Sequence, residues 1–368
     1  MANTPSRVTT GTKVTWPPQL SLSALSAAAT DKETIGKQSR WVHPHLIESI
    51  DPIKGRQLRA SQDIPAGTCI LIDCPYAIIP VVDNPATSEG LLCSNRACNR
   101  ALRAPASRVV CSKSCLSDVA WCSTTCRDSN MAYHNFECSW LKRYAVPIRK
   151  KWGEYVFGMS WVIVRLLASQ HVERTTRLED EGVRPTQEWK CDWRGVESLC
   201  GSVDSWSHEQ VRSWTLLVKK YLQKSAVLPH DMTPDQVLHL ICQEEANSFG
   251  LYPRETGIYP CPEPPMDRGE QYAAAVYPIA AMANHSCIPN MMHKPDESGR
   301  MIFTASQDIL AGQECCISYF DLTEHINLTS RREHLRKSFR FTCQCDRCTL
   351  EAPAQNSSDW SAMPLMDI

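Results

Sequence analysis

The segment Asn284-His285-Ser286-Cys287-Ile288-Pro289-Asn290 combines side chains suited to a ligand pocket with a potential metal ligand. That ligand is Cys287, and three closely spaced cysteines, Cys343, Cys345 and Cys348, follow far downstream. Structural zinc takes four thiolate or imidazole ligands in a tetrahedron, so this single cysteine and the triplet predict one zinc site. Closure of the site would tie the Asn-His turn to the C-terminal segment.

The composition predicts a globular chain without a strong net charge. Its 368 residues allow two or three modest domains, and a hydrophobic content of 43% can bury a proper core. A formal net charge of -1 does not indicate direct nucleic-acid binding or broad affinity for a membrane surface. The most apolar run, residues 155–168, is interrupted by Arg165 and predicts a buried amphipathic helix, so no membrane span is expected.

The 19 cysteines favour metal binding over disulfides. The N-terminus has no apolar secretory core, which predicts a reducing compartment for the chain. We expect a cytoplasmic location, a nuclear location or both, because no clear basic cluster acts as an import signal. A transit peptide stays open as an alternative, since the first acidic residue is Asp31.

Changes in composition divide the chain into segments. Residues 1–38, rich in Thr, Ser, Pro and Ala, predict a disordered leader, and residues 351–368 predict a loose tail. A turn between strand-like runs occupies residues 60–67, and residues 305–312 repeat its design. The repeat predicts two related β units in one domain, interrupted by a Cys-rich block and a mostly helical block.

The Cys-rich block, residues 93–138, carries four pairs of potential zinc ligands. A block this small cannot bury enough apolar surface to fold alone, so two bound ions would supply much of its folding free energy. Scattered structural cysteines are the alternative interpretation, but the repeated short spacings are typical of tetrahedral zinc coordination. The pairs are Cys93 and Cys98, Cys111 and Cys115, Cys122 and Cys126, and His134 and Cys138.

The order of these pairs resembles a MYND zinc finger. The spacings within the first two pairs are longer than the two intervening residues usual in that family. MYND fingers bind proline-rich peptides, so the resemblance implies a proline-rich partner. It also implies interleaved coordination, with one ion bound by Cys93, Cys98, Cys122 and Cys126 and the other by Cys111, Cys115, His134 and Cys138.

A MYND block inserted into a β domain that ends in Cys-x-Cys-x2-Cys resembles the SET-MYND protein-lysine methyltransferases, over most of the chain. The resemblance implies an α+β fold, with a SET-type β-fold of small sheets and a pseudoknot, interrupted by a MYND zinc finger and a helical insert and closed by a post-SET zinc site. The motifs that carry it are Gly55-Arg56-Gln57-Leu58, Asn247-Ser248-Phe249-Gly250, residues 284–290, and Gly312-Gln313-Glu314 followed by Ile317-Ser318-Tyr319.

The same resemblance divides the chain into domains. The post-SET site would hold a third zinc ion on Cys287, Cys343, Cys345 and Cys348. Because the chain ends soon after this site, we expect a short form without the C-terminal helical domain of many family members. The implied segments are the N-terminal part of the SET domain at 39–92, the MYND finger at 93–138, a helical insert at 139–235, the core SET domain at 236–335 and the post-SET segment at 336–350.

The cofactor that the resemblance implies is S-adenosylmethionine, with Phe341 stacked on its adenine. A zwitterionic nucleoside needs backbone and amide hydrogen bonds for its polar edges and an aromatic face for its base. Residue types of both kinds occupy the matching positions. The remaining implied contacts are Lys54, Gly55, Arg56, Gln57, Asn247, Asn284 and His285.

The implied reaction is direct transfer of a methyl group to a neutral lysine amine in a narrow aromatic channel. Lysine has a pKa of about 10.4 in water, and a channel that desolvates the ammonium favours the neutral nucleophile. We expect Tyr319 to orient the amine and the methyl group, Tyr277 to form another wall, and Phe339 to line the channel. Ordinary core packing is the alternative role for each of these aromatic residues.

Two functions follow from these motifs. The first is a protein-lysine N-methyltransferase that acts on a histone or a non-histone protein. The alternative is a catalytically inactive SET-MYND scaffold that recruits partners through its MYND finger. Two departures from the family pattern motivate the alternative: Gln57 replaces the second glycine of the N-terminal motif, and Phe339 stands where the family usually presents a tyrosine.

Overall fold

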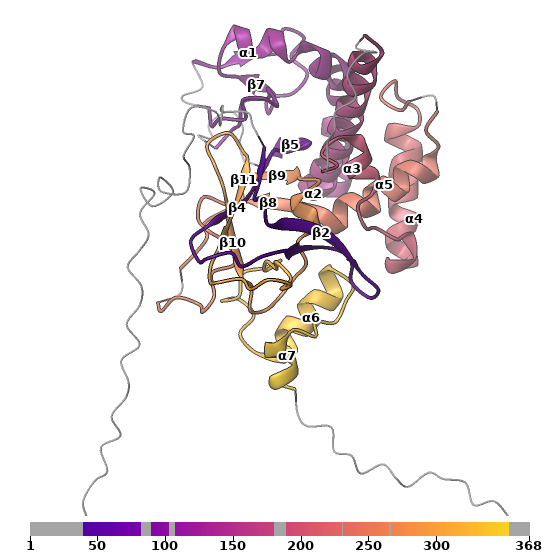
Figure 1. The fold of residues 1–368 in the computed structure, drawn as a ribbon. Coiled ribbons are helices and arrows are strands. Elements are labelled where there is room, and N and C mark those ends of the chain that lie inside the picture. The colour runs from indigo at the N-terminus through magenta and orange to yellow at the C-terminus, as the bar shows by residue number, and fades with distance from the viewer. Residues whose placement is uncertain are drawn as a thin grey trace, which may run out of the picture.

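The structure is a computed structural model that describes residues 40–81, 90–102, 107–179, 189–229, 231–264 and 266–352. The expected leader and nearly all of the expected C-terminal tail lie outside the described residues. Small sheets occupy the centre of the molecule, helices α2 to α5 gather on one side, and α6 and α7 lie at the opposite end from α1 (Figure 1). No helix in these described ranges is both long and apolar enough to cross a membrane.

Short antiparallel strands form the β part. In the described part of the chain they make a four-stranded sheet in the order β1-β4-β11-β10, a three-stranded sheet β5-β9-β8, and the pairs β2-β3 and β6-β7. Strand β8 is therefore an edge strand. The bounds are β1 Trp41–Val42, β2 Leu46–Asp51, β3 Gly55–Ala60, β4 Cys69–Asp73, β5 Ala77–Pro80, β6 Val109–Val110, β7 Ala120–Trp121, β8 Ser248–Leu251, β9 Ala273–Val276, β10 Met291–Pro295 and β11 Met301–Ala305.

Most of the helices lie in or next to the predicted helical block and in the C-terminal segment. Helix α2 contains the expected buried run 155–168, and it also begins before residue 138, so the proposed end of the zinc block lies inside this helix. It bends at Gly153, whose φ of 87° favours glycine. The bounds are α1 Thr124–Ser129, α2 Met131–Glu179, α3 Trp193–Glu197, η3 Val203–Ser205, α4 His208–Leu217, η4 Val218–Leu222, α5 Pro234–Asn247, η5 Ala280–Met282, α6 Leu328–Ser338 and α7 Asp346–Leu350.

The two copies of the repeated turn pair with each other. Ile64 and Ile309 exchange both backbone hydrogen bonds, at 2.8 and 2.9 Å. The turn glycines, Gly67 and Gly312, adopt φ values of 80° and 81°, and each donates its N–H to the first residue of the other copy. Because the pairing is reciprocal, the repeat joins the two halves of the β domain and brings β3 alongside the residues that follow the second turn.

Removing one of the carboxylates that cap this pairing should cost modest stability. Asp63 accepts the N–H of Ala311 at 2.7 Å, and Asp308 accepts the N–H of Ala66 at 2.8 Å. We expect Asp308→Ala to lower the free energy of unfolding by about 1 kcal/mol, measured by urea titration. Asp308→Asn keeps an accepting oxygen and should stay close to the wild type. Equal losses in both variants would contradict this role for the side-chain bond.

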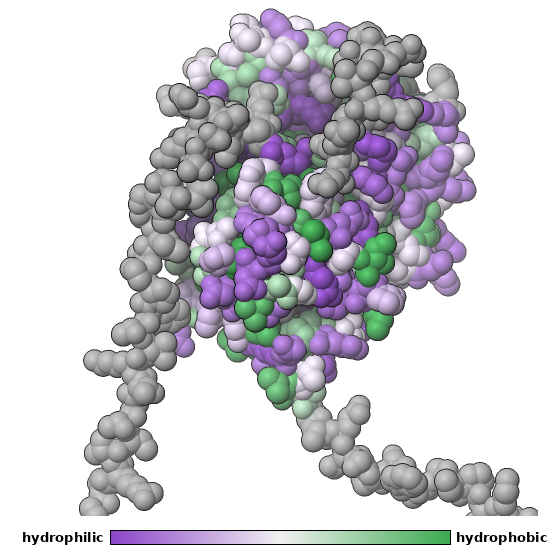
Figure 2. Space-filling view, viewed as in Figure 1, coloured by the Kyte–Doolittle hydropathy of each residue, from purple (hydrophilic) through white to green (hydrophobic). Residues whose placement is uncertain are grey.

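Three hydrophobic cores support these elements. One joins the zinc block to the helices around Trp140 and Trp161, a second lies between the sheets around Leu58 and Phe303, and a small third surrounds Cys287. On the face seen in Figure 2, apolar residues are scattered among hydrophilic ones. The large apolar side chains therefore serve mainly to hold the sheets, the helices and the C-terminal segment together.

Candidate active site

The Asn-His turn lies directly against the segment that contains Tyr319. Ile317 donates its N–H to the carbonyl of Asn284 at 3.0 Å and accepts the N–H of Ser286 at 2.9 Å. This short parallel pairing brings two motifs together that are well separated in the sequence. It fixes the backbone of the turn relative to that of Tyr319.

Asn290, the last residue of the turn motif, stabilises the same pairing through its side chain. Its amide nitrogen donates to the carbonyl of Glu314 at 2.8 Å, and its amide oxygen accepts the N–H of Cys316 at 2.8 Å. An amide side chain can serve both a backbone acceptor and a backbone donor, which a carboxylate cannot. Asn290 therefore has a positioning role that its place in the motif did not reveal.

The Glu314 carboxylate joins three of the eight predicted cofactor contacts, Lys54, Gln57 and Asn284. It accepts Lys54 Nζ at 2.5 Å and Asn284 Nδ2 at 2.9 Å. Partial burial acts to lower the pKa of Lys54, but the hydrogen bond and charge of Glu314 outweigh it and raise that pKa. Glu314 belongs to a family motif, but no role could be predicted for it from the sequence. No local pattern indicates a contact with so distant a lysine.

The side chain of Gln57 forms a hydrogen bond with the same carboxylate. Its side chain is buried, and with the amide nitrogen facing Glu314 Oε1 at 3.0 Å its oxygen accepts from Ser49 Oγ at 3.1 Å and from the guanidinium of Arg59. The bulk that replaces the family's glycine is thus held by hydrogen bonds within the chain. The departure at this position is compatible with an ordered site.

His285 links Tyr319 to the third cysteine cluster. Its Nδ1 accepts the backbone N–H of Tyr319 at 3.1 Å, and its Nε2 lies 3.3 Å from Cys287 Sγ. Burial lowers the pKa of His285 to about 3, so the ring is neutral and carries its proton on Nε2, facing the sulfur. Both ring nitrogens have partners within the chain, so any contact of His285 with a cofactor would come from its backbone.

Aromatic rings surround Tyr319. The centroid of Phe339 lies 5.0 Å from that of Tyr319, and Phe341 meets it edge-on at 6.3 Å. The Tyr319 hydroxyl donates to the carbonyl of Ala283 at 3.1 Å. Burial raises the pKa of Tyr319, which keeps its hydroxyl protonated at neutral pH. The side chain is therefore a rigid neutral donor in an apolar wall.

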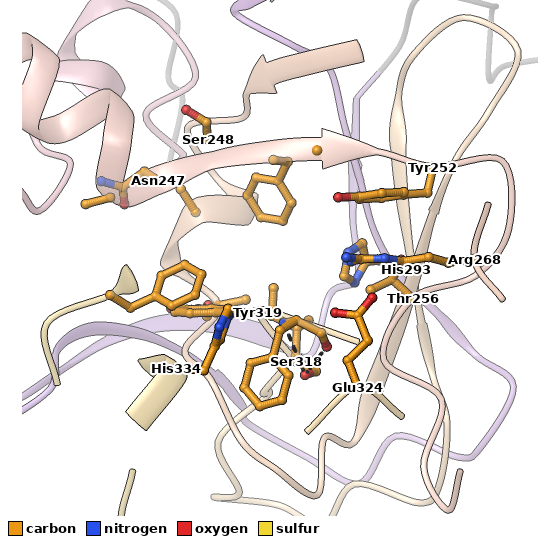
Figure 3. Close-up of a pocket in the computed structure, with 18 residues that line it drawn as sticks. Asn247, Ser248, Tyr252, Thr256, Arg268, His293, Ser318, Tyr319, Glu324 and His334 are labelled. Atoms are coloured by element: carbon orange, nitrogen blue, oxygen red, sulfur yellow. Dashed lines mark hydrogen bonds between the residues drawn. The ribbon is translucent and has the colours of Figure 1, made fainter. Parts of the chain in front are cut away.

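A cavity of about 180 Å³ opens beside this wall. Figure 3 shows Asn247, Tyr319 and His334 at one end of it and Tyr252, Thr256, Arg268 and Glu324 at the other. Phe249 of strand β8 and Phe339 also line the cavity. A narrow space between aromatic rings suits a long, thin side chain such as lysine.

Helix α5 delivers Asn247 to the end of this cavity. The helix begins with a capping box between Thr233 and Gln236 and ends at Asn247, where β8 follows at once. Asn247 Nδ2 donates to the carbonyls of Cys200 and Gln243 at 2.6 and 2.7 Å. It thereby holds a loop of the helical block beside the cavity.

Tyr277 does not form a wall of the cavity, which corrects the sequence expectation. Its side chain is fully buried, its hydroxyl donates to the carbonyl of Gly299 at 2.5 Å, and its ring meets Phe249 edge-on at 5.6 Å. Tyr277 therefore supports Phe249 from behind. Phe249 lines the cavity instead, although the sequence assigned it no role.

The predicted metal ligands come together in three groups. Within each group the four ligand atoms lie within 4.8 Å of one another. Sets of three or four thiols are typical of structural zinc, so the residues present fit that metal. The grouping is the interleaved one that the family resemblance implies. The groups are Cys93, Cys98, Cys122 and Cys126; Cys111, Cys115, His134 and Cys138; and Cys287, Cys343, Cys345 and Cys348.

A buried carboxylate near the start of helix α2, that of Glu137, connects the second group to the part of the same helix beyond the bend at Gly153. Glu137 Oε1 lies 3.4 Å from His134 Nδ1, the nitrogen turned away from the thiols, and Glu137 Oε2 accepts from Trp161 Nε1 at 2.7 Å and Arg165 Nε at 3.0 Å. Burial alone would raise the pKa of Glu137, but the charge of Arg165 outweighs it and the pKa falls to about 2. A carboxylate of this kind orients a metal-binding histidine.

A buried guanidinium supports the third group. Arg331 Nη2 lies 3.9 Å from Cys348 Sγ and forms an ion pair with Glu351 at 2.6 Å. Burial acts against the Arg331 charge, yet these partners raise its pKa. A fixed positive charge beside the cluster favours thiolate ligands. Helix α6 therefore helps to close the C-terminal segment over the Asn-His turn.

Comparison with known proteins agrees with this arrangement. The SET domain model matches residues 55–320. The chain is 26% identical over 304 residues to histone-lysine N-methyltransferase ASHR2 of Arabidopsis thaliana, with 81% of this chain and 70% of that protein covered. It is 24% identical over 327 residues to a SET and MYND domain-containing protein of Dictyostelium discoideum, with 82% and 59% covered.

The N-lysine methyltransferase SMYD2 of Homo sapiens is 26% identical over 316 residues, which cover 81% of this chain and 59% of that protein. The chain thus spans between 59% and 70% of the length of these relatives. The matched model covers most of the chain and includes β3, the Asn-His turn and Tyr319. It confirms the predicted SET-type fold, and the chain belongs to the SET domain family.

Proposed function

We propose that the protein is an S-adenosylmethionine-dependent protein-lysine N-methyltransferase. The observation that carries the proposal is the cavity lined by β8, Phe339 and Tyr319, with the Tyr319 hydroxyl held by the Ala283 carbonyl. Membership of the SET domain family supports it, as do relatives whose names include lysine methyltransferase. The acceptor would be a lysine of a histone or a non-histone protein.

The residues present fit the cofactor. Glu314 gathers Lys54, Gln57 and Asn284 into one polar cluster, and Phe341 offers an aromatic ring close to His285. A polar cluster beside an aromatic face matches the two halves of a nucleoside that carries an amino acid. When bound, the cofactor supplies an activated methyl group on a sulfonium.

The chain's own residues would prepare the lysine amine. An inserted lysine would pack against the rings of Phe249, Phe339 and Tyr319, and the loss of water from its amine would disfavour the ammonium form. The rigid hydroxyl of Tyr319 would hold the amine in line with the methyl group, so that most of the rate enhancement comes from alignment. This division of roles needs no general base among the lining residues.

The zinc groups would act as structural sites, with three ions per chain. The first two would fold the MYND block, which could bind a proline-rich peptide, and the third would hold Phe341 and the Asn-His turn in place. The cytoplasm, the nucleus or both remain the proposed location.

Titration of the zinc-loaded protein with S-adenosylmethionine in a calorimeter tests the proposal directly. We expect saturable binding with one site per chain, followed by transfer of labelled methyl groups to lysine peptides on an array. Absence of binding at high cofactor concentration would refute the enzyme and favour the inactive scaffold. Arg-for-lysine replacement in each methylated peptide is the control, because it removes the acceptor amine.

A further inference from the structure

A second, larger cavity adjoins the proposed active site. It is a groove of about 590 Å³ between β8 and helix α2, and it shares Ser248, Phe249, Gly250 and Phe339 with the first cavity. Figure 3 shows Ser248 pointing to the side of β8 away from Tyr319. Strand β8 is an edge strand of its sheet, and its residues line both cavities.

Two neighbouring carboxylates, Glu244 and Glu245, line this groove at the end of α5. Ser248 Oγ donates to Glu244 at 2.5 Å, and Tyr155 Oη donates to Glu245 at 2.7 Å. Glu244 is only 5% exposed. Burial and the charge of Glu245 raise the pKa of Glu244 to about 8, and burial also raises that of Glu245.

No positive side chain in the described ranges forms an ion pair with either of these carboxylates. Arg149, the arginine that lines the groove, is already paired with Asp118 at 2.5 Å and with Glu154 at 2.9 Å. Lys337 is the remaining lysine or arginine among the described lining residues. Arg149 thus pairs with Asp118 and Glu154, whereas Glu244 and Glu245 have no basic partner among the described residues, and the raised pKa of Glu244 means that this pair holds a proton near neutral pH.

We infer that this groove binds the part of the substrate polypeptide that flanks the target lysine, and that Glu244 and Glu245 select an arginine or lysine there. The inference rests on the proposed function, since the two cavities would hold one polypeptide. A chain whose lysine enters the first cavity can continue around the edge of β8 into the groove. A guanidinium or ammonium group would favour the ionised form of both carboxyl groups and pair with it, whereas a neutral or acidic side chain would provide no positive partner for them.

Binding of matched peptides tests this selection. The peptides carry one central lysine in a Gly, Ser and Ala background, with one arginine at each flanking position in turn, and each has a partner with glutamine there. Fluorescence anisotropy gives Kd, and methyl transfer gives kcat/KM. At one or more positions, the wild type should prefer arginine by about tenfold in Kd. The double variant Glu244→Gln and Glu245→Gln should lose that preference.

Two further variants keep the test decisive. Glu209→Gln removes one carboxylate from the exposed start of α4 and should keep the preference. If the double variant does not fold, the single variant Glu245→Gln is measured in its place and should reduce the preference for arginine. No preference in the wild type, or an unchanged preference without both carboxylates, would overturn the inference. A preference for arginine without methyl transfer would support the role of the groove and refute the proposed enzyme activity. Methyl transfer without a preference would support the enzyme activity and refute the role of the groove.

Discussion

Tyr319→Phe is expected to reduce kcat for peptide methylation by about 100-fold, because a small loss of alignment between reacting groups is that costly. The variant removes only the hydroxyl that donates to the Ala283 carbonyl, and the rings of Phe339 and Phe341 still hold the side chain. The affinity for S-adenosylmethionine, measured by calorimetry, should stay close to that of the wild type. Full activity in this variant would refute the proposed role of the hydroxyl.

Tyr277→Phe is the matched control. It removes the same hydroxyl group from a tyrosine that lies behind the cavity wall. Its hydroxyl donates to the Gly299 carbonyl inside the core, so the variant should lose about 1 kcal/mol of stability. Its kcat should remain near that of the wild type. A fall in kcat as large as that of Tyr319→Phe would mean that both hydroxyls act through packing alone.

The zinc ligands could be identified from the amino-acid sequence and grouped through the family resemblance, whereas the polar cluster around Glu314 could not be predicted. Cysteines at short spacings share one ion because tetrahedral coordination leaves few arrangements, and the family order then selects the interleaved one. Glu314 meets Lys54 only because the paired turns align β3 with the segment that follows the second turn. The repeated turns were visible in the sequence, but the side chains that their pairing would bring together were not.

The predicted positions of Tyr319 and Tyr277 in the cavity wall had different outcomes for a related reason. Tyr319 belongs to a motif whose backbone is fixed by the Asn-His turn, so its placement in the cavity wall follows from the pairing. Tyr277 and Phe249 lie on neighbouring segments that pack edge to edge. Which of two rings in contact faces a cavity depends on side-chain packing, and sequence spacing carries no such information.

Loss of the third zinc group should disable the site while sparing the first two groups. Cys287→Ser removes the one ligand that comes from the Asn-His turn, so we expect zinc content by elemental analysis to fall from three ions to two. Structural zinc can supply on the order of 10 kcal/mol of folding free energy, so the segment around α7 should lose its protection from hydrogen exchange. Methyl transfer should become undetectable, because His285 then has no thiolate to hold its ring against Tyr319.

Cys261→Ser is the matched control for this variant. Cys261 packs against the same small core but lies outside the three ligand groups, so its replacement should retain three ions and activity. Retention of three ions by Cys287→Ser would contradict the assigned ligand set. Loss of the third ion with activity intact would have a different meaning: the zinc would then hold the C-terminal segment without positioning Tyr319. The path from Cys287 through His285 to the Tyr319 backbone predicts instead that ion and activity are lost together.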